Sequence, residues 1–286
     1  MDRATAGWGS GLLGVIIFSG SLPATRVAVG DFSPLFLTSA RAVIAASLGG
    51  ACLVALRQVR PGRRDLGPLG LVALGVVVGF PLLTALALQH ITAAHSIVFI
   101  GLLPLATAVF GVLRGGERPK PAFWLFSGLG AATVSGFALM NSGAGSLTGD
   151  LLMIGAILLC GLGYAEGASL SRRLGGWQVI SWALLLALPV MTVVALFTLP
   201  GSWRGISSPS WLGLAYVSIF SMLIGFVFWY RGLALGGTAG VGQLQLLQPF
   251  FSLALASLLL GEPVAWTMIA ATAAVVLCVV GAKRFA

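Results

Sequence analysis

The stretch Gln243–Pro263, QLQLLQPFFSLALASLLLGEP, decides how the rest of the sequence is interpreted. It is an apolar segment of helical length that is interrupted by three glutamines and a proline and closes on Gly-Glu-Pro. A weaker copy, GLLPLATAVFGVLRGGERP, spans Gly101–Pro119. In both copies the acidic residue follows the proline by 13 positions: Pro104 to Glu117, and Pro249 to Glu262. A shared interval between shared residues indicates an internal repeat, and a repeat in an apolar chain is typical of transporters.

The composition predicts an all-α polytopic membrane protein. The chain has 286 residues, of which 58% are hydrophobic and only 8% are charged, and its mean hydropathy is +1.04. Soluble domains carry roughly 25% charged residues. The apolar residues come in runs of about twenty, the length that crosses a hydrocarbon core of roughly 30 Å. A β-barrel would instead show alternating runs of about ten residues, and the sequence has no such pattern.

The net charge of +9 first suggests nucleic acid as a partner. The basic residues, however, lie in short turns between apolar runs, where Lys and Arg act as topology signals. We therefore expect membrane lipid and a small-molecule solute as partners, and no nucleic acid. Cys52, Cys160 and Cys278 are odd in number and lie inside apolar runs, which favours packing over disulfides. The first apolar run lacks a small-residue cleavage site, so we expect a retained helix.

Ten membrane spans are predicted along the chain. Their connections are short and rich in Gly, Pro, Ser and Arg, and none is long enough for a soluble domain. The predicted spans are 8–27, 34–56, 68–88, 92–113, 121–140, 150–170, 178–199, 210–233, 238–260 and 264–282.

The distribution of positive charge predicts the orientation. With a cytoplasmic N-terminus, thirteen Lys and Arg fall on the inner side and only Arg26, Arg41 and Arg204 on the outer side. Both termini are then cytoplasmic. Because each half holds an odd number of spans, the second half enters the membrane in the opposite sense. Residues 1–145 and 146–286 are thus predicted to form two inverted five-helix repeats within one membrane unit.

Several motifs resemble those of one transporter family. They are Trp8-Gly9, Pro34 followed by Arg41, Pro104 with Gly116-Glu117-Arg118-Pro119, and Pro249 with Gly261-Glu262-Pro263. Across essentially the whole chain they resemble the drug/metabolite transporter superfamily, in its ten-helix EamA-type branch, and most closely the YddG-type exporters of aromatic and other amino acids. This resemblance implies export of small metabolites across the bacterial inner (cytoplasmic) membrane, without an ATP-binding part.

The two prolines predict helix breaks and a solute cavity. A proline inside a helix frees the carbonyl four residues back, which is that of Ile100 for Pro104 and that of Gln245 for Pro249. Inside a membrane a free carbonyl is tolerated only against protein or a water-filled cavity. Gln245, Gln248 and Ser252 share one helical face, so we expect that face to line a central cavity. The alternative is that the amides hydrogen-bond neighbouring helices.

Further cavity candidates lie on other spans. His95 and Phe99 share the corresponding face of the fourth span, although His95 also fits an interfacial position. Thr84 is assigned to the cavity from the third span, and Tyr164 and Trp182 from the second half. Aromatic rings stack on flat apolar solutes, but they also form belts at membrane interfaces. No metal site is expected, because His90 and His95 are about 140° apart on a helix.

The acidic residues have competing interpretations. Glu166 is the only acidic residue well inside a span, and such carboxylates are costly and often functional. It precedes Arg172-Arg173 by one or two turns, so pairing with that basic end competes with proton coupling. Glu117 and Glu262 are expected to be structural, at helix ends. Arg41 is expected to hold backbone carbonyls rather than a carboxylate.

The sequence therefore predicts a secondary transporter that works by alternating access around a midplane site. The expected solute is a small amphipathic metabolite, with an amino acid bearing an apolar or aromatic side chain as the best fit. A flippase for lipid-linked sugars or lipids is one alternative, and it would need a cavity open sideways to lipid. An intramembrane lipid-acting enzyme is another, but the chain has no His-Glu-x-x-His, Ser-His-Asp, acidic-pair or Cys-His arrangement, so no catalytic residue is assigned. No cofactor is expected, and the solute, the energy source and a monomeric or homodimeric state stay open.

Overall fold

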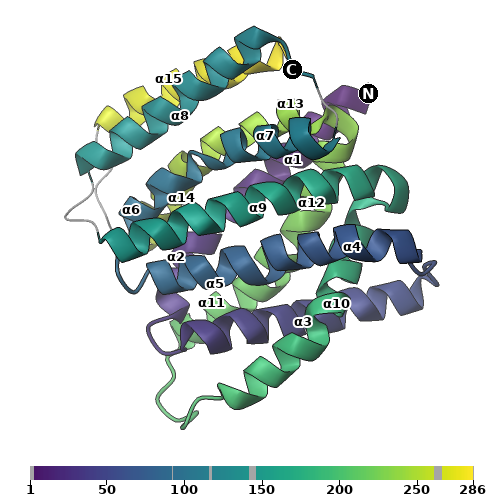
Figure 1. Cartoon of the computed structure of the whole chain (residues 1–286). Helices are drawn as coiled ribbons and strands as arrows, with labels where there is room; N and C mark the ends of the chain where they lie inside the picture. Colours follow the sequence, from purple (N-terminus) through teal and green to yellow (C-terminus); the bar gives the residue numbers. More distant parts are fainter. Residues whose placement is uncertain (1–2, 92, 116–117, 142–145, 261–265, 286) are drawn as a thin grey trace.

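The computed structural model describes residues 3–91, 93–115, 118–141, 146–260 and 266–285, and within them the chain is helical with short connections and no strand (Figure 1). This agrees with the all-α prediction. The elements are α1 (Arg3–Ser19), α2 (Ser21–Ala28), α3 (Pro34–Ala55), α4 (Arg63–Val72), η1 (Ala73–Gly79), α5 (Phe80–Ala87), α6 (Ala93–Ile100), α7 (Leu103–Gly115), α8 (Pro121–Asn141), α9 (Leu147–Leu174), α10 (Gly176–Phe197), α11 (Ser208–Ala215), η2 (Tyr216–Ile224), α12 (Gly225–Gly236), α13 (Thr238–Gly242), η3 (Gln243–Leu247), α14 (Gln248–Leu260) and α15 (Trp266–Lys283).

Seven helical stretches in the described residues are long and apolar enough to cross a membrane. They are Thr5–Ala28, Pro34–Ala55, Arg63–Ala87, Leu147–Leu174, Gly176–Phe197, Ser208–Gly236 and Thr238–Leu259. The other three predicted spans correspond to the α6–α7 pair, α8 and α15. Large apolar side chains such as Val54, Phe197 and Leu258 are exposed on the outside of the bundle, as a lipid-facing surface requires. The total of ten crossings stays a prediction.

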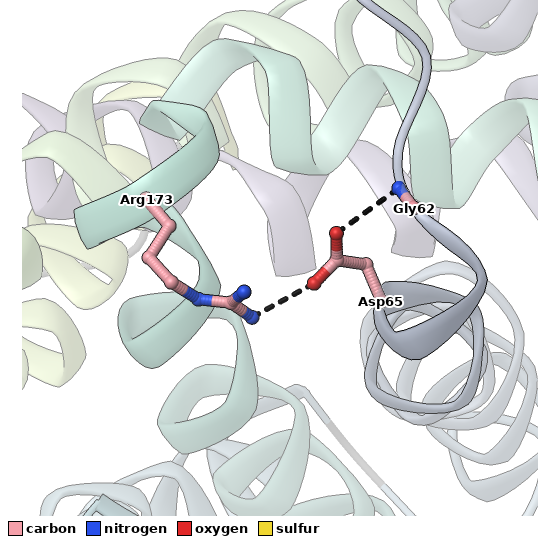
Figure 2. Close-up of polar contacts among 3 residues, drawn as sticks. All are labelled: Gly62, Asp65 and Arg173. Carbon is pink, nitrogen blue, oxygen red and sulfur yellow. Dashed lines mark hydrogen bonds and ion pairs between the residues drawn. The ribbon is translucent and has the colours of Figure 1, made fainter.

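The first turn of α4 shows why one boundary was misplaced. The helix begins at Arg63, five residues before the predicted start at residue 68. The Asp65 carboxylate accepts a hydrogen bond from the Gly62 N–H at 3.1 Å, which satisfies one of the free donors at the helix start (Figure 2). This turn contains Arg63, Arg64 and Asp65, so a search for apolar runs begins after it.

Both proline-containing helices are interrupted just before the proline. Before Pro104, α6 ends at Ile100 and α7 starts at Leu103. Before Pro249, a 3₁₀ turn, η3, separates α13 from α14. The Gln248 N–H donates to the Gln245 carbonyl, which is the carbonyl that Pro249 leaves without its α-helical donor. Of the two environments that the sequence allowed for this carbonyl, protein or a water-filled cavity, the structure shows the first, because the tighter turn supplies a backbone donor.

Two segments are π-helical. They are η1, inside the stretch Arg63–Ala87, and η2, inside the stretch Ser208–Gly236. Such wide turns are rare and occur often at functional sites. Neither was anticipated from the sequence.

Helices from the two halves of the chain pack in pairs. The most extensive packing is between α1 and α12, α3 and α10, α7 and α9, and α8 and α15. In Figure 1, α8 and α15 lie together along one edge, α3 and α10 lie toward the opposite edge, and the two chain ends are at the same end of the bundle. A Cβ on Gly7 would come within 2.8 Å of the Gly236 nitrogen, and one on Gly232 within 2.7 Å of the Gly11 Cα. Glycine is therefore required where α1 and α12 meet, since close backbone contact holds helices together in lipid.

Candidate functional site

A cavity of about 30 Å³ lies inside the bundle. That volume holds roughly one or two water molecules. It is lined from α1, α2, α3, η1, α5, α7, α9, η2, α12 and α14 by Phe18, Ser21, Leu22, Thr25, Arg41, Val76, Phe80, Pro81, Thr84, Leu103, Tyr164, Ser221, Phe226 and Gln248. Both π-helical segments contribute to this wall, through Val76 and Ser221.

One wall of the cavity is polar and centres on Arg41. The side chain is buried, with 6% of its surface exposed. Its Nη2 donates to the Ser221 hydroxyl at 3.1 Å, and the Ser21 hydroxyl donates to the same oxygen at 2.7 Å. The Arg41 Nε–H has no hydrogen-bond partner within the described part of the chain. The only partner found there is a hydroxyl, so the expectation that Arg41 holds backbone carbonyls is wrong.

Another part of the cavity lining is aromatic. The rings of Phe18 and Phe226 have centroids 5.0 Å apart, and that of Tyr164 lies 5.9 Å from Phe226. Trp229 packs behind them, with its centroid 5.4 Å from that of Tyr164. Contacts at these separations stabilise an apolar surface of fixed shape. The cavity lining is therefore amphipathic, since it combines cationic and hydroxyl groups with aromatic rings.

Three of the predicted cavity residues line this space: Thr84, Tyr164 and Gln248. Thr84 Oγ1 and Gln248 Oε1 also lack a partner among the described residues. Buried polar atoms without partners are uncommon in proteins and need an explanation. At this site a solute with donor groups can supply the missing bonds.

The other predicted cavity residues lie elsewhere. Gln245 is completely buried one 3₁₀ turn before Gln248 and is not among the residues that line the cavity. Ser252 is buried but does not reach the cavity wall, and Phe99 packs against the hydrophobic core. Trp182 lines a separate groove with Arg60 and Leu186. The sequence shows which residues share a helical face, but it does not show which neighbouring helix that face packs against. These assignments could therefore not be made reliably from the sequence alone.

Three further predicted residues fall where the structure gives no side-chain description. Glu117 and Glu262 lie outside the described residues. His95 belongs to α6, but its side chain is outside the description. Their roles stay predictions.

Glu166 pairs with an arginine that was not anticipated. Its carboxylate accepts from the Arg114 Nε–H, which joins α9 to α7, rather than pairing with Arg172-Arg173. Of the two side chains, that of Glu166 is 8% exposed and that of Arg114 is 49% exposed. A second pair joins α9 to α4, with Arg173 Nη2 2.8 Å from Asp65 Oδ1 (Figure 2). Asp65 lies at the start of α4 and Arg114 in the last turn of α7, whereas the cavity is lined from the far end of α4–η1–α5 and from the start of α7. On α9 the two regions adjoin, because Tyr164 of the cavity is two residues before Glu166.

The cavity residues that sequence reasoning missed are Arg41, Ser21, Thr25 and Ser221, together with the two phenylalanines of the aromatic wall. One signal was available for Arg41, because it is the only charged residue between Pro34 and Ala55. A lone charge inside an apolar run is by default a candidate for function. The hydroxyl residues carry no comparable signal.

Comparison with known proteins identifies relatives across the whole chain. The EamA-like transporter family matches twice, over residues 6–139 and 147–282. The uncharacterized transporter YdeK of Bacillus subtilis (strain 168) is 65% identical over 286 residues, covering 100% of both chains. The uncharacterized transporter YvbV of the same organism is 24% identical, over 94% of this chain and 89% of its own. One solved crystal structure superposes with a TM-score of 0.81 at 19% identity, covering both chains completely, and it shows the fold alone. The chain therefore belongs to the EamA-like transporter family of multi-pass membrane proteins, within the drug/metabolite transporter superfamily.

Proposed function

We propose that this protein is a secondary transporter that exports small amphipathic metabolites, aromatic amino acids among them, across the bacterial inner membrane by alternating access. The observation that carries the proposal is the central cavity, whose lining combines aromatic rings with polar atoms that have no partner among the described residues. Aromatic rings favour a flat apolar group of the solute, and the polar wall favours its charged or hydrogen-bonding group. In this respect the cavity resembles what a YddG-type exporter of amino acids requires.

Alternating access needs two halves that move against each other, and three observations support an inverted repeat. The family matches each half once. The two π-helical segments fall in the third and eighth predicted spans, five spans apart. The contacts between helices also recur in the two halves. The first span packs against the eighth (α1 with α12), and its counterpart, the sixth, packs against the third (α9 with η1 and α5). The fourth span packs against the sixth (α7 with α9), and its counterpart, the ninth, packs against the first (α14 with α1).

The size of the cavity bears on the mechanism. An amino acid does not fit into about 30 Å³, so the helices must separate before a solute enters. The ion pairs Glu166–Arg114 and Asp65–Arg173 close the bundle on the proposed cytoplasmic side. We propose that they break when the cavity opens to the cytoplasm and form again when it opens outward. For Glu166 this assigns a gating role rather than proton coupling.

A carrier is favoured over a flippase because the cavity wall draws on helices from all around the bundle. Ten elements contribute to it, and Arg41, Thr84, Tyr164 and Gln248 on that wall are all buried. A flippase needs a polar path that opens sideways to lipid. The described cavity has its polar residues inside.

The test is solute counterflow in liposomes containing the full-length protein, with labelled aromatic amino acids, with and without a proton gradient. Gln248→Leu and Tyr164→Phe alter the cavity wall and should lower the rate or change the substrate profile. Trp182→Phe is the matched control, because Trp182 lies in a separate groove and its replacement should leave the rate unchanged. Unchanged profiles in both cavity variants at equal protein levels would overturn the proposal.

A further inference from the structure

The charges around the cavity point to a narrower class of solute. Among the described residues that line the cavity, Arg41 is the only charged one, and its guanidinium meets a serine hydroxyl rather than a carboxylate. A buried charge without a counter-ion is costly, and such groups are normally paired. Resting on the proposed transport function, we propose that the cavity selects organic monoanions, with the solute's carboxylate binding to Arg41 and an apolar or aromatic body packing against Phe18, Tyr164 and Phe226.

The acidic side chains in the described structure are all occupied elsewhere. Asp31 accepts hydrogen bonds from Ser207, Asp65 pairs with Arg173, and Glu166 pairs with Arg114. Asp150 also has an interaction of its own and is not part of the cavity wall. In this closed arrangement none of the described carboxylates lines the cavity, so none meets a positive group of a solute there. Among the described residues, an ammonium group there would meet only neutral oxygens, those of Thr25, Thr84, Tyr164, Gln248 and the serines.

Electrostatics then orders three types of solute. A carboxylate cancels the charge of Arg41, and guanidinium–carboxylate bonds are strong and directional. A zwitterion gains the same contact but must also strip water from its ammonium group without a counter-charge. An amine without a carboxylate brings a second positive charge beside Arg41 and is disfavoured. The expected order of affinity is carboxylate, then zwitterion, then amine.

The position of Arg41 fits this role. Ser221 holds Nη2 in place from η2, and Ser21 in turn donates to Ser221 from α2, so the guanidinium is oriented by two elements other than its own. Nε remains free of protein partners among the described residues. The arrangement leaves donor capacity for a carboxylate while the side chain itself stays fixed, as a preorganised site requires.

The experiment uses three compounds with the same ring and chain: 3-phenylpropionate, phenylalanine and 2-phenylethylamine. Binding to the purified full-length protein in detergent is measured by calorimetry, and movement by counterflow in liposomes. In the wild-type protein 3-phenylpropionate should bind most tightly and 2-phenylethylamine least. Arg41→Gln should weaken binding of 3-phenylpropionate about 10- to 100-fold, the range of a charged hydrogen-bonded contact. Arg41→Lys, which keeps the charge, should retain the order with a smaller loss.

Arg64→Gln is the matched control, because Arg64 is exposed in the first turn of α4 and its loss lowers the net charge by the same amount. It should leave all three affinities unchanged. If Arg41→Gln does not fold, the wild-type order and Arg41→Lys decide alone. Equal or stronger binding of phenylalanine or 2-phenylethylamine, or no binding of any of the three, overturns the anion proposal.

The two proposals fail separately. Counterflow of amines or zwitterions that is insensitive to Arg41→Gln leaves the transport function standing and overturns the anion site. Binding of 3-phenylpropionate that depends on Arg41, without counterflow of any solute, supports the anion site and overturns the transport function.

Discussion

Where α4 begins and α9 ends, buried carboxylates lie against guanidinium groups that reach the surface: Glu166 with Arg114, and Asp65 with Arg173. In the cavity, which adjoins this region on α9 at Tyr164, the arrangement is reversed. There a buried guanidinium, Arg41, has only serine hydroxyls beside it. One region satisfies its charges within the protein, and the other leaves a charge to be satisfied by a solute.

This difference bears on which contacts can open and close. The arginines of the two ion pairs are 49% and 61% exposed, so water can replace the carboxylates when the pairs separate. Because water can rehydrate one partner of each pair, separating it costs less than separating two fully buried charges, which suits contacts that must break in a working cycle. Arg41 is only 6% exposed and lines a cavity with room for roughly one or two water molecules, so its charge is better explained by binding than by stability.

The largest expected effect comes from disrupting the close contact between α1 and α12. Gly7→Ala places a Cβ within 2.8 Å of the Gly236 backbone nitrogen, and backbone atoms cannot move aside as a side chain can. We expect a loss of about 1–3 kcal/mol in the free energy of unfolding, seen as a lower melting temperature in detergent. Gly9→Ala on the same helix is the control, since a Cβ there meets nothing within 4 Å. Equal effects of the two changes would contradict the close contact.

The next effect separates the two partners of one ion pair. Arg114→Gln leaves the Glu166 carboxylate buried without a counter-charge, so it should cost about 1–3 kcal/mol of stability. Glu166→Gln leaves Arg114, which is half exposed and regains water, so it should cost less. Thermal unfolding of both single variants and of the double variant measures the asymmetry. A larger loss of stability in Glu166→Gln than in Arg114→Gln would show that burial of an unpaired carboxylate is not the main cost of breaking this ion pair.

Arg41 should behave in the opposite way. Arg41→Gln removes a buried charge that has no counter-ion in the described structure, so the free energy of unfolding should stay within about 1 kcal/mol of wild type or rise. The measurement is the melting temperature without solute, beside that of Arg114→Gln. A large destabilisation would mean that Arg41 serves the fold, and the contrast between the two regions would then disappear.

The smallest effect concerns the turn between α2 and α3. Hydrogen bonds from the Ser207 hydroxyl and N–H, at 2.6 and 2.9 Å, lower the pKa of the Asp31 carboxyl, with a smaller effect of Ser210. A carboxyl whose pKa is lower in the folded state stabilises the fold above its unfolded pKa of about 3.9. That contribution is lost as the pH falls through the lower folded value. Asp31→Asn should therefore have a slightly lower melting temperature at pH 7, and the difference should vanish under strong acid. A difference that persists there would exclude this origin.

Much of the fold followed from local patterns. Runs of about twenty apolar residues located the helices within a few residues, because lipid requires that length and that composition. The breaks before Pro104 and Pro249 follow from the missing N–H of proline. The start of α4 was missed because its first turn is charged and depends on the cap by Asp65.

The site was less predictable because it depends on contacts between distant residues. Glu166 and Arg114 are 52 positions apart, and nothing in either segment tells which arginine the carboxylate meets. Arg41 and Ser221 are 180 positions apart. Thr84, Tyr164 and Gln248 were assigned to the cavity and line it, whereas Gln245, Phe99 and Trp182 were assigned with equal reason and lie elsewhere. Whether a residue lines the cavity depends on the rotation of its helix about the helix axis. That rotation is set by packing against neighbouring helices.

The wide turns at η1 and η2 have a consequence for how the cavity changes shape. A π-helical turn holds about one residue more than an α-helical turn. Sliding that surplus along the helix swings the intervening side chains by about 100°, while the two helix ends keep their positions. Val76 and Ser221 can thus turn toward or away from the solute without displacing the loops that border the membrane. The solute selectivity of the cavity can then change by rotation of part of a span about its own axis. Cross-links between loops that stop the two halves from rocking would still permit this rotation.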